Sequence, residues 1–303
     1  MNKKVMKEIV VISGKGGTGK TSVMACFAAL AENPVLADCD VDAADLHLVL
    51  SPEVAEEHEF SGGKNAQIIE NTCSGCGKCY ELCRYNAINE TTTWDSFPKT
   101  SYTIDPVYCE GCGVCAWFCP EKAIDFKEAV NGKWFISDTR FGPMVHAKLG
   151  IAEENSGKLV TIVKNQAKKI AEERGRSYVI VDGSPGIGCP VIASLTGANL
   201  VVIVTEPSLS GAHDLERVAD LTKHFNIPTV VCVNKYDINP EITNHIEEKA
   251  NSRSISTVGN IRYDRAVTDA QIMKTTVVEY TNAPVSEDIK KTWQNVLSIL
   301  HTE

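Results

Sequence analysis

The chain has 303 residues, of which 43% are hydrophobic and 23% are charged, and its formal net charge at pH 7 is −9. This composition excludes collagen, intrinsic disorder and a coiled coil, and the length exceeds that of one average domain. The acidic balance argues against binding to nucleic acid or to an anionic membrane, and no apolar run approaches the roughly 18 residues of a membrane span. We therefore expect a cytoplasmic protein that binds neither nucleic acid nor membrane.

Short apolar runs that predict buried strands alternate with segments of helical periodicity along most of the chain. The expected strands are residues 8–13, 34–37, 178–181, 200–204, 229–233 and 255–261. The expected helices are residues 20–31, 158–174, 214–225, 240–250 and 287–300. Strands that alternate with helices of this length predict an α/β fold in which a mostly parallel sheet is covered by helices on both faces.

The stretch from residue 62 to residue 131 interrupts this alternation, because it is rich in Cys, Gly and Thr and poor in apolar residues. Such a segment is more readily held by metal than by packing. We expect it to be a small inserted α+β domain, with residues 1–61 and 132–303 forming the α/β domain around it. Its halves, residues 72–88 and 108–124, repeat the pattern C-x2-C-x2-C-x3-C followed by Ala-Ile, which predicts a two-fold module.

A phosphate-binding motif follows the first expected strand. It fits G-x4-G-K-[ST] between a strand and a helix, which is the context of a P-loop. Its residues are Gly14, Lys15, Gly16, Gly17, Thr18, Gly19, Lys20 and Thr21. The glycines let backbone N–H groups turn toward phosphate, and the helix N-terminus adds positive potential. We expect Lys20 to reach the β- and γ-phosphates of ATP and the Thr21 hydroxyl to bind Mg²⁺; a glycine-rich turn without a ligand is the weaker alternative.

Lys15, directly after the first glycine, makes this motif similar to the deviant Walker A motif of the MinD/ParA family. That family includes the nitrogenase iron protein and the scaffold ATPases of iron–sulfur cluster assembly. The resemblance implies that Lys15 reaches the phosphates of the nucleotide bound by the facing subunit, so that a homodimer encloses two ATP molecules at its interface. A solvated loop lysine is the alternative.

Polar residues at the ends of later strands agree with this resemblance. Asp38 and Asp40 close the second expected strand, where the family places switch I; Asp40 is expected to orient the attacking water and Asp38 to lie near the metal. Asp182 ends an apolar strand and resembles the Walker B aspartate that holds Mg²⁺ through water. Asn234 resembles the family's adenine-contacting asparagine. Asp and Asn at strand ends are also ordinary turn residues, which is the alternative for each.

Eight of the twelve cysteines lie in the inserted stretch and have the spacing of bacterial ferredoxins that hold [4Fe–4S] clusters. In a cytoplasmic chain such clustering favours metal over disulfides. The fourth cysteine of each run normally ligates the other cluster. The expected ligands are Cys73, Cys76, Cys79 and Cys119 for one cluster and Cys83, Cys109, Cys112 and Cys115 for the other. Zinc is the alternative, since four-cysteine zinc sites also use C-x2-C.

Along nearly its full length, including residues 205–215, the chain resembles a MinD-type ATPase with an inserted two-cluster ferredoxin domain. The resemblance implies ATP hydrolysis and three cofactors: ATP or ADP, Mg²⁺ and two [4Fe–4S] clusters. Three functions are open: nucleotide-gated electron transfer to a redox partner, assembly or delivery of a metal cluster to an accepting protein, and a positioning ATPase. Eight ligands for two complete clusters favour permanent electron carriers, and hence the first function.

Cys189 and His146 are two further candidate functional residues. Cys189 follows Asp182 by seven residues, and in the nitrogenase iron protein a cysteine at the corresponding distance ligates a cluster shared between subunits. No cysteine between Cys119 and Cys189 supplies the second ligand of that arrangement. Cys189 is therefore either a thiol at the dimer interface or a packed apolar residue. His146 is a candidate contact for a substrate or partner.

Overall fold

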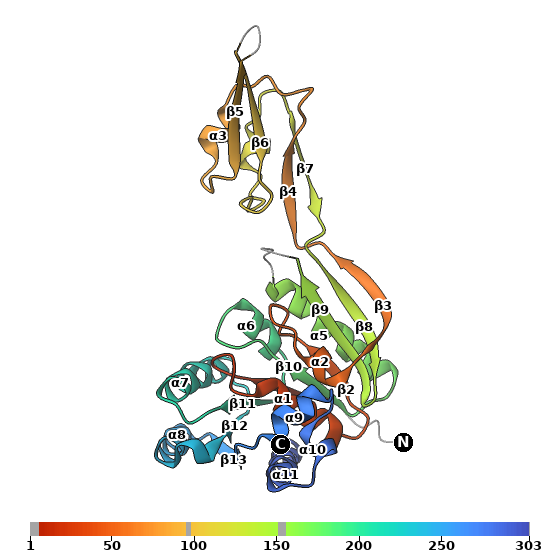
Figure 1. Cartoon of the computed structure of the whole chain (residues 1–303), viewed down its shortest axis with the longest axis vertical. Helices are drawn as coiled ribbons and strands as arrows, with labels where there is room; N and C mark the ends of the chain where they lie inside the picture. The colour runs from red at the N-terminus through yellow and green to blue at the C-terminus, as the bar shows by residue number, and fades with distance from the viewer. Residues whose placement is uncertain (1–5, 95–97, 151–155, 303) are drawn as a thin grey trace. The chain divides into compact units, whose positions relative to one another are not determined.

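The structure, a computed structural model, describes residues 6–94, 98–150 and 156–302, which form two compact units (Figure 1). Unit 1 comprises the chain up to His58, Trp134–Lys148, and the chain from Ser156 onward. Unit 2 comprises Glu59–Lys133 and a short segment that begins at Leu149.

A nine-stranded sheet forms the centre of unit 1. From one edge to the other its strands are β13 (Ser256–Ile261), β12 (Thr229–Asn234), β11 (Leu200–Thr205), β1 (Lys7–Ile12), β10 (Tyr178–Asp182), β2 (Val35–Asp38), β9 (Gly142–Leu149), β8 (Gly132–Thr139) and β3 (Glu53–Phe60). Neighbouring strands from β13 to β9 pair in parallel. The central strands are continuous apolar runs because both faces of the sheet are buried. The expectation of an α/β fold with a mostly parallel sheet is confirmed.

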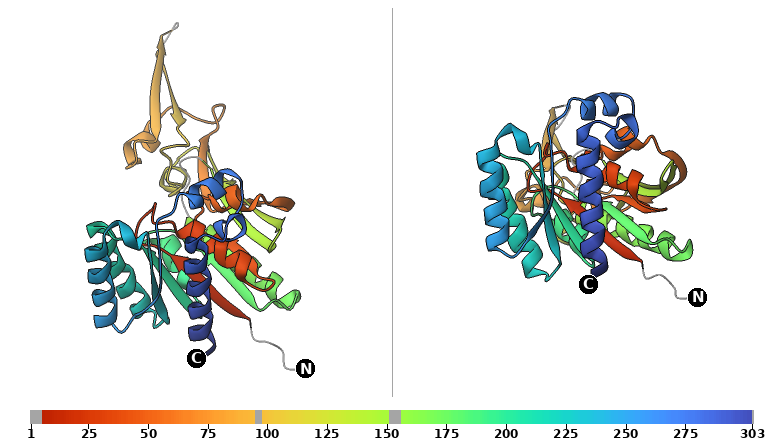
Figure 2. Two further views of the ribbon diagram at one scale, coloured as in Figure 1. Left: turned by 60° about the horizontal axis from the view of Figure 1, so that its bottom comes forward. Right: turned by 90° about the horizontal axis from the view of Figure 1, so that it is seen from below.

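Helices cover both faces of this sheet. They are α1 (Lys20–Leu30), α2 (Leu46–Leu50), α5 (Ser156–Glu173), α6 (Cys189–Leu195), α7 (Leu209–His224), α8 (Pro240–Ser252), α9 (Ala266–Ile272), α10 (Val277–Tyr280) and α11 (Pro284–Thr302), with a 3₁₀ turn η1 (Tyr236–Ile238). Helices α1 and α11 share one hydrophobic core, in which the rings of Phe27 and Trp293 lie 5.0 Å apart. Figure 2 shows α11, in dark blue, running along the sheet to the C-terminus.

The strands β9, β8 and β3 were not predicted from the sequence. Most side chains of β3 are exposed, so it lacks the alternation of apolar and polar residues that identifies a half-buried strand. Helix α7 also begins earlier than the predicted residue 214. Its first turn is stabilised by Ser208, whose hydroxyl accepts a hydrogen bond from the backbone N–H of Gly211.

Unit 2 consists of two antiparallel strand pairs and two short helices. The pairs are β4 (Gly63–Ile68) with β7 (Ile124–Ala129) and β5 (Ile88–Trp94) with β6 (Pro98–Ile104); the helices are α3 (Lys78–Leu82) and α4 (Val114–Trp117). The halves make equivalent backbone hydrogen bonds, from Ile69 N to Ala123 O (2.8 Å) and from Asp105 N to Ala87 O (2.7 Å). The sequence repeat is therefore also a structural repeat.

Glycine is required within each cysteine run of unit 2. Gly75 and Gly111 have positive φ angles of 73° and 59°, which side chains rarely adopt. A Cβ atom at Gly75 would lie 2.7 Å from the carbonyl oxygen of Thr100, and one at Gly111 would lie 2.2 Å from that of Lys64. Each cysteine loop therefore lies directly against a strand, and any side chain at these positions would separate the two.

In the part of the chain that the structure describes, none of the helices combines the length and the apolar character that a membrane crossing requires.

A buried ionic contact joins α5 to the start of β1. The Nζ atom of Lys164 lies 2.8 Å from Oε1 of Glu8, and the two side chains are 3% and 1% exposed. Lys168 Nζ lies 2.9 Å from the other oxygen of Glu8, and Lys164 also donates to the carbonyl oxygen of Thr196 after α6. Burial lowers the pKa of Lys164, and the charge of Glu8 opposes that shift. Removing one buried partner leaves the other charge uncompensated.

We expect Lys164→Met to destabilise unit 1 by about 3 kcal/mol, because Glu8 keeps only its contact with Lys168. Lys168→Met is the matched control: its side chain is 27% exposed, so water can replace part of its contact and the loss should be smaller. Thermal and urea unfolding of both variants measure the difference. Equal losses would contradict the importance of burial at this contact.

Candidate functional site

The carboxyl ends of four strands bring the predicted nucleotide-binding residues to one edge of unit 1. Parallel strands end on the same side of a sheet, where α/β proteins bind ligands. In the pairing of β10 with β2, Asp182 lies opposite Asp38, and in the pairing of β10 with β1 it lies opposite Val11, three residues before the P-loop. A cleft of about 850 Å³ opens at this edge, lined by the P-loop from Gly16, by Asp40 and by the end of β12.

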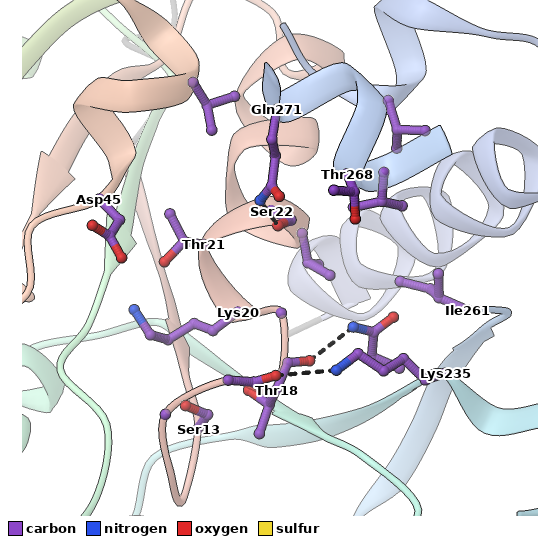
Figure 3. Close-up of a pocket in the computed structure, with 18 of the residues that line it drawn as sticks. Ser13, Thr18, Lys20, Thr21, Ser22, Asp45, Lys235, Ile261, Thr268 and Gln271 are labelled. Carbon is purple, nitrogen blue, oxygen red and sulfur yellow. Dashed lines mark hydrogen bonds between the residues drawn. The ribbon is translucent and has the colours of Figure 1, made fainter. Parts of the chain in front are cut away.

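The end of β12 holds the P-loop in place. The Asn234 side-chain amide donates to the carbonyl oxygen of Thr18 at 2.7 Å, and Lys235 Nζ donates to that of Gly17 at 3.1 Å (Figure 3). Gly19 has a φ angle of 87°, and a Cβ atom there would lie 2.3 Å from the Asn234 amide nitrogen. Glycine at this position therefore permits both the turn and the close approach of Asn234.

Lys20 is buried among the predicted carboxylates. Its Nζ atom lies 2.7 Å from Oδ1 of Asp182 and 3.3 Å from Oδ2 of Asp40. Burial alone would lower the pKa of Lys20, but the charges of Asp182 and Asp40 outweigh burial and raise that pKa. Lys20 is thus a permanent cation at the bottom of the cleft.

Two oxygen atoms beneath the cleft fit a divalent cation. Oδ2 of Asp38 and Oδ2 of Asp182 are buried and have no hydrogen-bond partner among the described residues. Burial, and then the charge of Asp182, raise the pKa of Asp38 well above its usual range; burial also raises that of Asp40. Thr21 lies on the cleft wall beside Lys20 (Figure 3). Carboxylate and hydroxyl oxygens are the ligands Mg²⁺ prefers, so this donor set fits Mg²⁺.

Lys15 is not among the residues that line this cleft; it contacts the segment after β11 and the start of α7. Its Nζ atom lies 2.7 Å from Oε1 of Glu206 and donates to the hydroxyls of Ser208 (3.1 Å) and Ser210 (2.9 Å). Lys235 Nζ lies 3.0 Å from the other oxygen of Glu206. Partial burial opposes ionisation of Glu206, yet its hydrogen bonds to the two lysines lower its pKa. Within one subunit, Lys15 therefore has a complete set of partners.

Sequence reasoning missed several residues of the site. Glu206 is the first, although it directly follows β11 at the same edge of the sheet. Ile261, the last residue of β13, the three residues after it and Gln271 of α9 also line the cleft, and in Figure 3 Ile261 lies on the side opposite Asp45. Their signal was position: each follows a strand whose carboxyl end meets this edge, or lies on the next helix.

The eight cysteines of unit 2 line two separate cavities. One cavity is lined by Cys73, Cys76, Cys79 and Cys119, and the other by Cys83, Cys109, Cys112 and Cys115. The fourth cysteine of each run therefore lies beside the first three of the other run. Four thiolates around one cavity are what a [4Fe–4S] cluster requires, so each set fits such a cluster.

The thiols are crowded in both cavities. Burial, and then the neighbouring thiolates, raise the pKa of Cys115 to about 11 and also raise that of Cys79. The positive charge of a bound metal would stabilise the thiolate form of these cysteines, which is the form that binds metal. Among the described residues, no group of three or more Cys, His, Asp or Glu side chains is arranged so that it could hold one single metal ion.

Cys189 is exposed at the first residue of α6, directly after residues 183–188. The alternative of a packed apolar thiol is therefore wrong. A role at a dimer interface stays a prediction.

The chain matches a family of nucleotide-binding proteins and is similar to several known proteins. The model of the CobQ/CobB/MinD/ParA nucleotide-binding domain matches residues 9–277. Two uncharacterized proteins of Methanocaldococcus jannaschii, MJ0578 and MJ0579, are 32% identical over 238 residues and 30% identical over 239. These matches cover 78% and 77% of this chain and 80% and 81% of the relatives. A putative formate dehydrogenase of Staphylococcus aureus is 30% identical over 129 residues, which are 39% of this chain and 13% of that protein.

Solved structures of MinD are similar to this chain in fold. The cell division ATPase MinD of Pyrococcus furiosus has a TM-score of 0.58 and 15% identity, covering 97% of this chain and 100% of that one. MinD of Pyrococcus horikoshii, complexed with Mg-ADP, has a TM-score of 0.58 and 14% identity, covering 97% of both. At these identities the likeness concerns the fold alone.

We expect Asp38→Asn to stabilise the protein at neutral pH in the absence of Mg²⁺ and nucleotide. The pKa of Asp38 is higher in the folded than in the unfolded chain, so its contribution to stability is fully present below the unfolded value, near 4, and is lost as pH rises through the folded value. Asparagine has no proton to lose. The expected gain at neutral pH is about 1 kcal/mol, or roughly 2–4 °C in Tm.

Melting curves at pH 5 and pH 8, with EDTA or with Mg-ADP, measure this effect. Mg-ADP should stabilise the wild type more than Asp38→Asn, because the variant lacks one carboxylate. Asp42→Asn, an exposed position nearby, is the control. An Asp38→Asn variant that matches the wild type in all four conditions would show that Asp38 is not a metal-site carboxylate.

Proposed function

Because the chain belongs to the CobQ/CobB/MinD/ParA nucleotide-binding family, we propose that it is a Mg²⁺-dependent ATPase whose ATP-driven dimerisation is coupled to electron transfer through two [4Fe–4S] clusters in unit 2. One observation carries this proposal: a chain with a P-loop also places eight cysteines, four by four, around two cavities. A positioning ATPase would leave these cysteines without a role.

The nucleotide site needs one rearrangement to hydrolyse ATP. Lys20 now neutralises Asp182 and Asp40. Asp182, Asp38 and the Thr21 hydroxyl would hold Mg²⁺, which would neutralise charge on the phosphates. Lys20 would then leave the carboxylates and reach the β- and γ-phosphates. Asp40, no longer paired with Lys20, is placed to orient the attacking water.

Dimerisation depends on Lys15. Its side chain is 28% exposed, so its bonds to Glu206, Ser208 and Ser210 are open to competition from a stronger anion. The phosphates of a nucleotide bound to the facing subunit carry more charge than one carboxylate. We propose that Lys15 exchanges its partners for those phosphates, so that two subunits close over two ATP molecules. In this mechanism the dimer closes only when ATP is bound, because Lys15 needs the phosphates of the facing subunit's nucleotide as its partners.

The clusters would supply one-electron carriers of low potential, about −400 mV in many ferredoxins. In unit 2, Cys73, Cys76, Cys79 and Cys119 would hold one of them. Cys83, Cys109, Cys112 and Cys115 would hold the other. The glycine-bearing loops fix three thiols of each set, and the fourth comes from the other half. In this crossed arrangement each half of unit 2 would supply three ligands to one cluster and one ligand to the other cluster.

A second function, assembly or delivery of a metal cluster, is favoured by Cys189. It is an exposed thiol immediately after residues 183–188, the segment next to the Walker B strand. In a closed dimer two such thiols could share a transferable cluster. If Cys189→Ser retains iron and electron transfer but loses cluster delivery to an apo-acceptor, the second function replaces the first.

We expect Lys20→Ala to abolish nucleotide binding. Lys15→Ala should bind ATP normally but remain monomeric, with a loss in kcat of about 100-fold or more, because it lacks a charge that acts only in the closed dimer. Light scattering with a non-hydrolysable ATP analogue and a turnover assay measure both effects, with the exposed Lys223→Ala as control. A monomeric Lys15→Ala that hydrolyses ATP at the wild-type rate would refute the dimer mechanism.

Anaerobically purified protein should contain about eight iron and eight sulfide per chain. Cys83→Ser should reduce iron to about four, since one cluster loses a ligand. Adding Cys112→Ser, whose thiol lines the same cavity, should cause no further loss, whereas adding Cys76→Ser should remove nearly all iron. Iron analysis and EPR of the reduced protein read out each variant. The opposite pattern of double variants refutes crossed ligation, and zinc in place of iron refutes the clusters.

A further inference from the structure

Besides the nucleotide cleft, unit 1 has a cavity of about 370 Å³ that shares only Leu48 with that cleft. Three basic residues line it: His47 of α2, His146 of β9 and Lys274, which follows α9. Leu48, Pro52 and Val54 supply its apolar wall, and none of its lining residues is acidic. We call it the basic cavity. Basic groups gathered without a carboxylate are unexpected in a chain whose net charge is −9.

His146 is held rigidly in this cavity. Its Nε2 atom lies 2.8 Å from the hydroxyl oxygen of Ser137, which is fully buried. Its ring stacks on Phe135 with centroids 5.1 Å apart. Burial, and then the charge of His47, lower the pKa of His146 to about 4, so the ring is neutral at physiological pH. Within the described ranges, its second nitrogen has no hydrogen-bond partner, which leaves an oriented imidazole with a free site.

The other two basic side chains are also without partners. Across residues 6–94, 98–150 and 156–302, neither His47 nor Lys274 makes an ion pair or a side-chain hydrogen bond. The backbone at Lys274 is in the left-handed region, with φ of 55°, and is held by a hydrogen bond from its N–H to the carbonyl oxygen of Gln271. Lys274 is thus placed by its turn rather than by a carboxylate. The side chains of His47, His146 and Lys274 therefore line one cavity, and each has a nitrogen atom that could bind a ligand.

We propose that the basic cavity binds a small organic anion through a phosphate or carboxylate group. The Lys274 ammonium supplies the charge, the imidazoles supply directional hydrogen bonds, and the apolar wall contacts the carbon part of the ligand. A divalent cation fits less well, because two imidazoles would have to bind it beside the Lys274 charge. The three basic residues of the site do not line the nucleotide cleft.

The same elements connect the basic cavity to the nucleotide cleft. Leu48 of α2 lines both cavities, and α2 directly follows Asp45, which lines the cleft. Lys274 lies two residues after Ile272, which also lines the cleft. An anion that draws α2 and the end of α9 together therefore changes the cleft wall on two sides. We assign the bound anion the role of an effector of ATP turnover.

Binding is tested on the full-length protein saturated with Mg-ADP, so that the P-loop cannot bind the probe. Inorganic phosphate and succinate are titrated in separate experiments. Calorimetry measures the binding, and NMR of the histidine rings reports which histidines are affected. We expect at least one probe to bind at one site per chain and to shift two histidine signals. One of these signals should be missing in His47→Ala and the other in His146→Gln. Lys274→Ala should weaken binding at least about tenfold, whereas the exposed Lys223→Ala and His245→Ala should not.

Turnover, measured as ADP formation, should change at least twofold with the bound probe in the wild type and not in Lys274→Ala. The phosphate and succinate arms distinguish a phosphorylated from a carboxylate effector. Absence of saturable binding by both probes, or equal binding by Lys274→Ala, overturns the anion site. Saturable Zn²⁺ binding lost in both histidine variants, without anion binding, overturns it in favour of a metal. Anion binding without an effect on turnover overturns the effector role.

Discussion

The contact between Lys20 and the buried carboxylates at the carboxyl edge of the sheet governs the rest of unit 1. Parallel pairing of β2, β10 and β1 places Asp38 and Asp182 side by side under the P-loop. Such carboxylates repel each other in a low dielectric, which together with burial raises the pKa of Asp38, while the ammonium of Lys20 pairs with Asp182 and Asp40. Oδ2 of Asp38 and Oδ2 of Asp182 are left without a hydrogen-bond partner among the described residues, and the proposed Mg²⁺ would bind there.

The same logic extends outward through Glu206. This carboxylate pairs with Lys15 and Lys235, and Lys235 and Asn234 in turn hold the P-loop backbone. Lys15 and the P-loop backbone are therefore linked by short polar contacts that run through Glu206 and Lys235.

Unit 2 follows a different principle. Much of its apolar surface is exposed, including Trp117, whose surface is 85% exposed, and its loops lie against strands where only glycine fits. Small domains with so little core need another source of stability, and metal ligation is a common one. The crossed sets of cysteines would join its two halves through each cluster. In unit 1 stability comes from packing, and in unit 2 the ligands of the proposed clusters would supply it.

The sequence by itself determined features that depend on neighbours along the chain. The strand–glycine–helix order identified the P-loop, apolar runs identified six strands, and the spacing of the cysteines identified their two sets. Only the tertiary structure decided contacts between distant residues: Lys15 with Glu206, Lys20 with Asp182, and His146 with Ser137. The physical reason is that periodicity and backbone conformation are local, whereas strand order decides which strand ends meet. The strands β9, β8 and β3 show the same limit, because their place at the sheet edge comes from pairing and not from a pattern of apolar residues.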